Sequence, residues 1–271
     1  MLTPFRMDTN SLYVTEQLNL LGVDVVFKSI VGDDLRRLVA AAQHGLFRSD
    51  ILIFSGGLGP TEDDLTREAV AEALGLGLRR DPEILNRIEQ RFAERGWTMA
   101  SNNAKQADVL DGATVLPNPN GTAPGQWLSG QFDGREHIIV LLPGPPHELK
   151  ALFESEVRER LRAKVPPASL AIRTLKIAML GESTVDARVA PIYKRYADVE
   201  TTILAGAGEI ELHFKTRAPT PATSSTRRCA ASMKWRAWSK TSWMMRSTRA
   251  TANRWSRSSA TGFRCATPPW L

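Results

Sequence analysis

The stretch SGGLGPTEDDLTREAV, residues 55–70, decides the fold class of this chain. It follows a short apolar run at residues 51–54, which is typical of a buried strand in a parallel sheet. It leads into residues 65–74, whose apolar spacing predicts a helix. A strand, a glycine-rich turn and a helix in this order form the repeating unit of an α/β domain.

The same stretch carries residue types that bind phosphate. A glycine turn that feeds a helix N-terminus can hold an anion with its backbone N–H groups. Asp63 and Asp64 stand just before the helix, where carboxylates beside a phosphate suit a bridging divalent cation. We interpret both as catalytic and metal-binding candidates; alternatively, the glycines only turn the chain and the aspartates only cap the helix. The candidate phosphate-binding residues are Gly56, Gly57, Gly59, Thr61 and Thr66.

Two later loops should meet this turn, because loops at the carboxyl ends of strands form the ligand crevice of an open α/β sheet. One is NPNGTAPG, residues 118–125, whose side chains suit a heterocycle or ribose; an ordinary hairpin loop is the alternative. The other follows the apolar strand at residues 137–142. Beyond it, Glu148 is a candidate general base or metal ligand, or else a surface carboxylate favoured by the helix dipole.

The rest of the chain also alternates between strand-like and helix-like patterns. The alternation predicts an α/β fold with a mostly parallel sheet, to which residues 23–30 contribute a further strand. Pro166 and Pro167 mark a linker, followed by a small α/β subdomain with strands at residues 171–179 and 209–215. We therefore predict one domain at residues 1–165, a second at 166–217 and a tail at 218–271.

Charge separates that tail from the rest of the chain. Residues 218–271 contain ten Lys or Arg and no Asp or Glu, whereas residues 1–217 hold 25 basic and 29 acidic residues. The net charge of +6 is thus an average that says nothing about the partners of the acidic body. No apolar run approaches the roughly 20 residues of a membrane helix, no secretory signal opens the chain, and the two cysteines lack metal-site spacing. We expect a cytoplasmic protein without a membrane partner.

Three long motifs, in the correct order, resemble the amino-terminal domain of the CinA (competence/damage-inducible protein A) family. They are GGLGPTEDDLTREAVAEALG from residue 56, NNAKQADVLDGATVLPNPNGTAPG from residue 102 and LLPGPPHEL from residue 141. The likeness extends over about residues 2–217. It implies a three-layer α/β/α domain of the MoaB/Mog molybdopterin-binding type, with a crevice for a small-molecule pterin or nucleotide.

The resemblance also implies an activity, namely metal-dependent hydrolysis of the pyrophosphate of ADP-ribose. Mg²⁺ or Co²⁺ would be the divalent ion, potassium is a further candidate cation, and a homodimer is expected. Carried over onto this sequence, the resemblance also implies a set of ligand-wall residues beside the phosphate-binding candidates named above. They are Asn118, Asn120, Gly121, Thr122, Gly125, Pro143, Gly144, Pro145 and Glu148. Family members often add a nicotinamide-nucleotide deamidase domain, which we do not find in this chain. They also begin with a strand and an acidic glycine turn that this chain lacks, so we expect either an upstream start or a crippled product.

We interpret residues 218–271 as a disordered, out-of-frame tail. It contains no Ile or Val, and five of the seven Trp residues of the chain lie there. Because Met and Trp each have a single codon, a shifted reading of residues 233–248 is tightly constrained, yet it permits an acidic, helix-like peptide. A frameshift near residues 217–228 explains this pattern. Nucleic-acid binding through the interleaved Arg and Trp is an alternative that we do not favour.

The sequence therefore leaves three functions open for the body of the chain. The first is a hydrolase of the ADP-ribose pyrophosphatase type. The second is a module that binds molybdopterin or a nucleotide without hydrolysing it. The third is an inactive, truncated product.

Overall fold

The computed structural model describes residues 7–166, 168–206 and 208–219. The chain divides into two compact units, of which one comprises Met1–Asn19 and Val23–Val165 and the other Leu20–Gly22 and Pro166–Leu271. Most of the predicted tail, and with it the predicted frameshift, lies outside the described residues. Within the described part of the chain, no helix is both long and apolar enough to cross a membrane.

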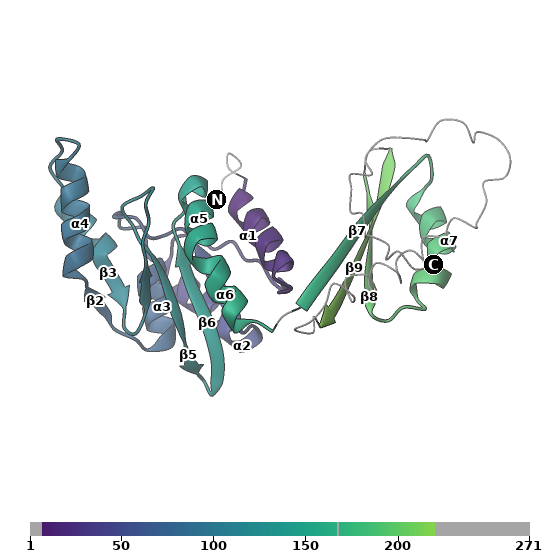
Figure 1. Cartoon of the computed structure of the whole chain (residues 1–271), viewed down its shortest axis with the longest axis horizontal. Helices are drawn as coiled ribbons and strands as arrows, with labels where there is room; N and C mark the ends of the chain where they lie inside the picture. Colours follow the sequence, from purple (N-terminus) through teal and green to yellow (C-terminus); the bar gives the residue numbers. More distant parts are fainter. Residues whose placement is uncertain (1–6, 167, 207, 220–271) are drawn as a thin grey trace, which may run out of the picture. The chain divides into compact units, whose positions relative to one another are not determined.

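The first unit contains most of the helices and strands (Figure 1). Its elements in chain order are α1 (Thr9–Leu20), α2 (Leu35–Arg48), β1 (Ile51–Ser55), α3 (Thr66–Leu74), β2 (Leu78–Arg80), α4 (Pro82–Ala93), β3 (Asp108–Leu110), β4 (Thr114–Leu116), β5 (Gly125–Phe132), β6 (Arg135–Leu142), α5 (Pro146–Leu152) and α6 (Arg158–Lys164). A 3₁₀ segment, Ser101–Ala107, precedes β3, and a π-helical turn, Phe153–Val157, joins α5 to α6. The α/β class expected from the sequence is confirmed.

The main sheet of this unit is mixed, which corrects the expectation of a mostly parallel sheet. Its strand order is β1-β6-β5-β4, and only β1 and β6 run parallel. The cause lies in the two-residue turn between β5 and β6. Asp133 and Gly134 have φ values of 49° and 75°, and a two-residue turn with positive φ at both positions joins antiparallel strands.

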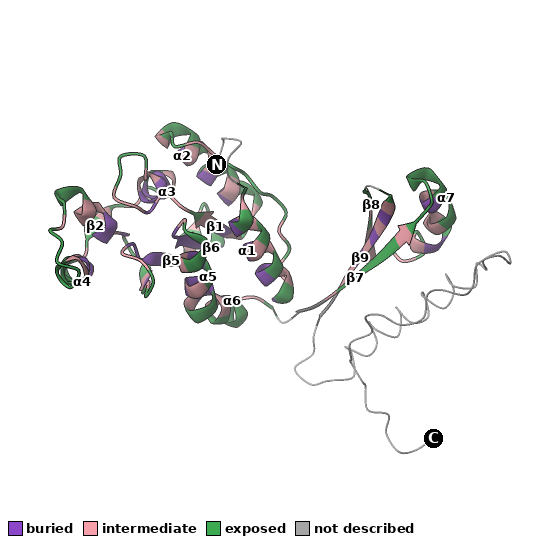
Figure 2. Ribbon diagram, turned by 90° about the horizontal axis from the view of Figure 1, so that it is seen from above, coloured by how far each residue is buried: buried purple, intermediate pink, exposed green. Residues whose placement is uncertain are grey.

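Helices cover both faces of this sheet, so the unit has three layers. Helices α2 and α3 lie over one face, and α5 and α6 lie over the other, as both views show (Figures 1 and 2). Successive side chains of a strand point to opposite faces. In β6, Ile139 and Leu141 accordingly pack in one cluster with Val70 of α3, whereas Val140 and Leu142, which alternate with them, are also fully buried.

Helix α4 and the two-stranded antiparallel sheet of β2 and β3 form a smaller layer of their own. Asp81 caps α4 by accepting hydrogen bonds from two backbone amides of its first turn, and Pro82 occupies the first helical position. The buried side chains of Ile84 and Ile88 face Val109 of β3. This packing holds α4 in place, and several of its residues, Ile84 and Ile88 among them, line the pocket described below.

The predicted strand at residues 23–30 is wrong. That segment has no regular secondary structure, and three of its apolar side chains, Val26, Phe27 and Ile30, are 61%, 56% and 52% exposed. Its composition suits a strand, but no described strand lies beside it to share the ladder of hydrogen bonds that a strand needs.

The second unit is an antiparallel sheet with one helix. It contains β7 (Ala168–Ala178), α7 (Glu182–Tyr193), β8 (Val199–Ala205) and β9 (Glu209–Pro219), with strand order β7-β9-β8. Apolar side chains of α7 and β9, among them Val185 and Phe214, make its core. The sequence did not predict β8. Because β9 pairs with β7 as far as Pro219, the ordered chain also extends two residues into the range assigned to the tail.

Candidate functional site

The glycine turn after β1 is held by the helix that follows it. Gly56 and Gly57 have φ values of 94° and 69°, in the region that favours glycine. The Thr66 hydroxyl donates to the Gly56 carbonyl at 2.8 Å, and the Thr66 amide donates to the Gly57 carbonyl at 3.2 Å. A Cβ on Gly57 would stand 2.1 Å from the Thr66 hydroxyl oxygen. Thr66, predicted to bind ligand, thus donates its hydroxyl to the turn itself.

The two candidate metal-binding carboxylates converge on one hydroxyl. The Thr61 Oγ1 atom lies within hydrogen-bond distance of Asp63 Oδ1 and 2.6 Å from Asp64 Oδ2. Asp64 Oδ2 also accepts from the Thr61 amide at 3.0 Å, and a Cβ on Gly59 would stand 2.3 Å from that oxygen. The hydrogen bond from Thr61 holds the pKa of the exposed Asp63 carboxyl below its ordinary value, and the nearby Lys105 ammonium acts in the same direction.

The oxygens of Asp63 and Asp64 are of the kind that a hard divalent cation binds, but they are too few to fill its coordination shell. Mg²⁺ prefers oxygen ligands and commonly takes one or two carboxylates, with waters and substrate phosphate completing its shell. Asp63 and Asp64 supply two adjacent carboxylates. Among the described residues, no group of three or more His, Cys, Asp or Glu side chains is placed to hold a metal ion. A metal ion at this pair would therefore depend on oxygens of the ligand.

The proline loop after β6 lies against the glycine turn. The Gly56 amide donates to the Leu142 carbonyl at 2.9 Å, and a Cβ on Gly144 would stand 3.4 Å from the Gly56 Cα. This contact follows from the parallel pairing of β1 with β6, which brings the carboxyl ends of both strands to one edge. Pro143 is buried, whereas Pro145 is exposed and immediately precedes α5.

Glu148, in the first turn of α5, is held by the asparagine loop. Its carboxylate Oε2 accepts a 2.7 Å hydrogen bond from Asn118 Nδ2, which also donates to the Ala123 carbonyl at 2.8 Å. The Glu148 side chain is only 15% exposed. A Cβ on Gly121 would lie 1.9 Å from the same Oε2 atom, so glycine is needed there for the carboxylate to fit. The structure thus joins two of the predicted segments directly at Glu148.

The remaining predicted residues of this loop have different surroundings. Asn120 is exposed, and its backbone N–H donates to Asn118 Oδ1 at 3.1 Å, so it helps to shape the loop. Thr122 lines the pocket described next. Gly125 is buried at the start of β5, where a Cβ would meet Leu152 at 2.5 Å and the Leu141 carbonyl at 2.9 Å. Close packing therefore accounts for glycine at position 125.

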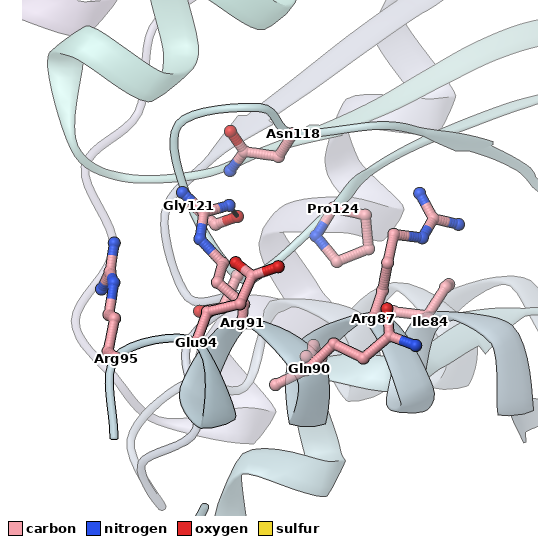
Figure 3. Close-up of a pocket in the computed structure, with 11 residues that line it drawn as sticks. Ile84, Arg87, Gln90, Arg91, Glu94, Arg95, Asn118, Gly121 and Pro124 are labelled. Atoms are coloured by element: carbon pink, nitrogen blue, oxygen red, sulfur yellow. Dashed lines mark hydrogen bonds between the residues drawn. The ribbon is translucent and has the colours of Figure 1, made fainter. Parts of the chain in front are cut away.

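A pocket of about 440 Å³ opens between α4 and the asparagine loop (Figure 3). One side is the exposed face of α4, and the other is formed by residues of the loop. Figure 3 shows Asn118, Gly121 and Pro124 on the loop side, across from the charged side chains of the helix. The lining residues are Ile84, Arg87, Ile88, Gln90, Arg91, Glu94, Arg95, Asn118, Gly121, Thr122 and Pro124.

Comparison with known proteins identifies the family. Residues 2–163 match the model of a probable molybdopterin binding domain. A CinA-like protein of Koribacter versatilis is 57% identical over 220 residues, which are 81% of this chain and 53% of that protein. The crystal structure of CinA from Thermoplasma acidophilum matches with 31% identity and a TM-score of 0.51, covering 57% of this chain and 88% of that one. This chain belongs to the CinA family.

A second CinA-like protein, from Acidobacterium capsulatum, is 54% identical over 219 residues, or 81% of this chain and 53% of its own length. The chain thus spans about half the length of these CinA-like relatives. The resemblance inferred from the three motifs is confirmed, as is the molybdopterin-binding type of the first domain.

Two residues of this CinA-family site had not been predicted from the sequence. Asn10 of α1 is 3% exposed, and its Nδ2 atom donates to the Gly144 carbonyl at 2.7 Å and to Ser55 Oγ at 2.9 Å. It therefore links the ends of β1 and β6, while its Oδ1 atom is buried without a hydrogen-bond partner in the described chain. Local sequence spacing could not indicate that Asn10 contacts residues 45 and 134 positions away.

Arg67 is the second such residue. Its side chain is fully buried, and its guanidinium donates to the Leu58 carbonyl at 2.8 Å and to the Gly59 carbonyl at 3.0 Å. Burial lowers the pKa of this group, and its Nε atom has no hydrogen-bond partner in the described chain. Two carbonyls of the glycine turn thus point inward, toward a buried positive charge.

Proposed function

We propose that this chain is a metal-dependent nucleotide pyrophosphatase that acts on ADP-ribose. The observation that carries the proposal is the Glu148 carboxylate, which is largely buried and accepts a hydrogen bond from Asn118. A general base must be held in position to take a proton from an attacking water. The family likeness supplies the substrate, and the glycine turn with its two aspartates supplies groups suited to a pyrophosphate.

Each group then has a distinct role in hydrolysis. The Glu148 carboxylate takes a proton from water, and the water oxygen attacks one phosphorus of the pyrophosphate. The P–O bond on the far side of that phosphorus breaks, which gives AMP and ribose 5-phosphate. Asp63 and Asp64 would hold a divalent ion, which would supply positive charge against the charge that develops on the phosphate oxygens. The amides of the glycine turn, apart from that of Gly56, which donates to the Leu142 carbonyl, would orient the pyrophosphate.

The experiment compares release of AMP by the full chain and by the variant Glu148→Gln, with ADP-ribose and Mg²⁺ or Co²⁺. We expect AMP from the unaltered chain and at least a hundredfold slower release from the variant, the usual order for loss of a general base. Glu62→Gln is the matched control, because Glu62 is an exposed neighbour of the aspartate pair with no hydrogen bond or ion pair among the described residues. If the unaltered chain releases no AMP, the proposal fails.

A second function is a pterin- or nucleotide-binding module without hydrolysis. The match to a probable molybdopterin binding domain favours it. Tight binding of ADP-ribose without turnover, in the presence of either metal ion, would select this function over the first. An inactive product would neither bind nor hydrolyse the nucleotide.

The origin of residues 218–271 decides whether this chain has the same sequence as the natural protein after about residue 217. We infer that translation leaves the natural frame near residues 217–228, on the codon argument given above. Sequencing the genomic DNA across these codons tests the inference, and a missing or extra base is the expected result. An unbroken frame that matches the given sequence would exclude it.

A further inference from the structure

Arg91 joins helix α4 to the asparagine loop, residues 118–125, by two hydrogen bonds. Its Nη1 atom donates to the Gly121 carbonyl at 2.6 Å, and its Nη2 atom donates to the Pro119 carbonyl at 3.2 Å. Both acceptors belong to the backbone, so the two bonds fix the course of the loop itself. Figure 3 shows Arg91 between α4 and Gly121 of the loop.

The position of Arg91 on α4 directs its side chain to the loop. Ile84, Ile88 and Arg91 follow one another at intervals of four and three residues, which places them along one side of the helix. The two isoleucines are 4% and 2% exposed and pack in one cluster with Val109 of β3. Because this packing fixes the rotation of α4, Arg91 is held half-buried beside the loop instead of pointing into solvent.

Gly121 connects this arginine to the candidate base. Its carbonyl accepts the shorter of the two Arg91 hydrogen bonds. A Cβ on Gly121 would stand 1.9 Å from Glu148 Oε2 and 2.6 Å from Asn118 Nδ2. The backbone of Gly121 therefore packs against the hydrogen bond that Asn118 donates to the Glu148 carboxylate. A displacement of Gly121 would change the space in which that carboxylate is held.

Few other hydrogen bonds fix the position of this loop. Inside the loop, Asn118 bonds to two backbone groups. Among the described residues, the hydrogen bonds that join residues 118–124 to other segments are those with Arg91 and the one with Glu148. Arg91 is therefore the group that fixes the loop independently of the carboxylate that the loop holds.

We propose that Arg91 is a positioning residue for hydrolysis, which fixes the asparagine loop and, through Gly121 and Asn118, orients the Glu148 carboxylate. A reacting group that is misplaced by about 1 Å can lose about a hundredfold in rate. A guanidinium suits this task, because its rigid, planar fork donates to two acceptors at once. This inference deepens the proposed function, and it rests on that function for the role of Glu148 as the base.

The first measurement is AMP release from ADP-ribose by the full chain and by Arg91→Met, which keeps an apolar stem and removes both donors. We expect kcat to fall at least tenfold while KM stays within about twofold, because Arg91 orients the base and is not proposed to touch the substrate. Arg91→Lys should recover part of the rate, since its ammonium can still donate to one carbonyl. Glu89→Met is the matched control. Glu89 is exposed on the same helix, lies outside the pocket lining and has no hydrogen bond or ion pair among the described residues.

A double variant separates positioning of Glu148 from a general folding defect. In Glu148→Gln the base is already lost, so adding Arg91→Met should change the residual rate less than about twofold. A further tenfold loss in that background would overturn the proposal, because Arg91 would then act independently of Glu148. A KM that rises as much as kcat falls in Arg91→Met would also overturn it.

NMR measures the same link without hydrolysis. The side-chain amide protons of Asn118, which donate to Glu148, should exchange with solvent at least tenfold faster in Arg91→Met than in the unaltered chain or in Glu89→Met. Unchanged exchange would refute the link between Arg91 and the carboxylate. Faster exchange in Arg91→Met, together with no AMP from the unaltered chain, would refute hydrolysis and support the hold of Arg91 on the loop.

Discussion

Replacing Arg67 by Met should destabilise the glycine turn, since Met keeps much of the apolar stem and removes the guanidinium. The variant loses two hydrogen bonds from a charged donor, at 2.8 and 3.0 Å to the Leu58 and Gly59 carbonyls. Bonds of this kind contribute about 1.5–3 kcal/mol each, so the gross loss is about 3–6 kcal/mol. Part of it is offset because no buried charge remains to be desolvated. We expect a net loss of about 2–4 kcal/mol in the free energy of unfolding.

Urea denaturation of the full chain, followed by far-ultraviolet circular dichroism, measures this change. Arg36→Met on the surface of α2 is the control, and it should stay within about 0.5 kcal/mol of the unaltered chain. Hydrogen exchange adds a local measurement, because the Thr66 amide that donates to Gly57 should lose protection in Arg67→Met. Unchanged stability together with unchanged protection of that amide would refute the reasoning that the buried guanidinium holds the turn.

Two further predictions concern single side chains of the site. Gly121→Ala should displace the Glu148 carboxylate and slow AMP release at least tenfold. The melting temperature should fall little, because the added methyl group clashes with the end of a flexible side chain. Gly181→Ala is the control, because Gly181 has open space around it, and it should change neither quantity. Thr61→Val should raise the pKa of Asp63 toward its ordinary value, which carboxyl-carbon NMR titration measures. Because the Asp63 pKa is lower in the folded than in the unfolded chain, the Asp63 carboxylate stabilises the fold at pH values above its unfolded pKa. This contribution is lost as the pH falls through the folded pKa. An unchanged Asp63 pKa in Thr61→Val would contradict the role assigned to the Thr61 hydrogen bond.

The sequence predicted those elements whose signals are local. The strand before the glycine turn and the helix after it follow from apolar spacing, and Asp81 with Pro82 gives the start of α4 a clear signal. The β5–β6 hairpin also had a local sequence signal, because Asp133-Gly134 is a strong turn dipeptide. It was missed because β5 begins with a glycine and carries polar residues at its exposed end, unlike the apolar strand β6.

The candidate site was less accessible to sequence reasoning, because its contacts join distant segments. Glu148 and Asn118 were both named from their motifs, but their hydrogen bond depends on how α5 packs beside the loop. Arg67 looks like a surface residue of an amphipathic helix, and only the fold of the turn around it makes it buried. Arg91 of α4 likewise looks like a solvated residue until the asparagine loop is placed beside it, where the guanidinium donates to the Gly121 and Pro119 carbonyls.

The bond from Arg91 to the asparagine loop also has a kinetic consequence. The loop is fastened to α4 by two hydrogen bonds to backbone carbonyls, whereas the sheet behind it is held by a whole ladder of them. Local opening of the loop at these two hydrogen bonds should therefore occur far more often than unfolding of the domain. The asparagine loop could then open and close while the hydrogen bonds of the sheet stay intact.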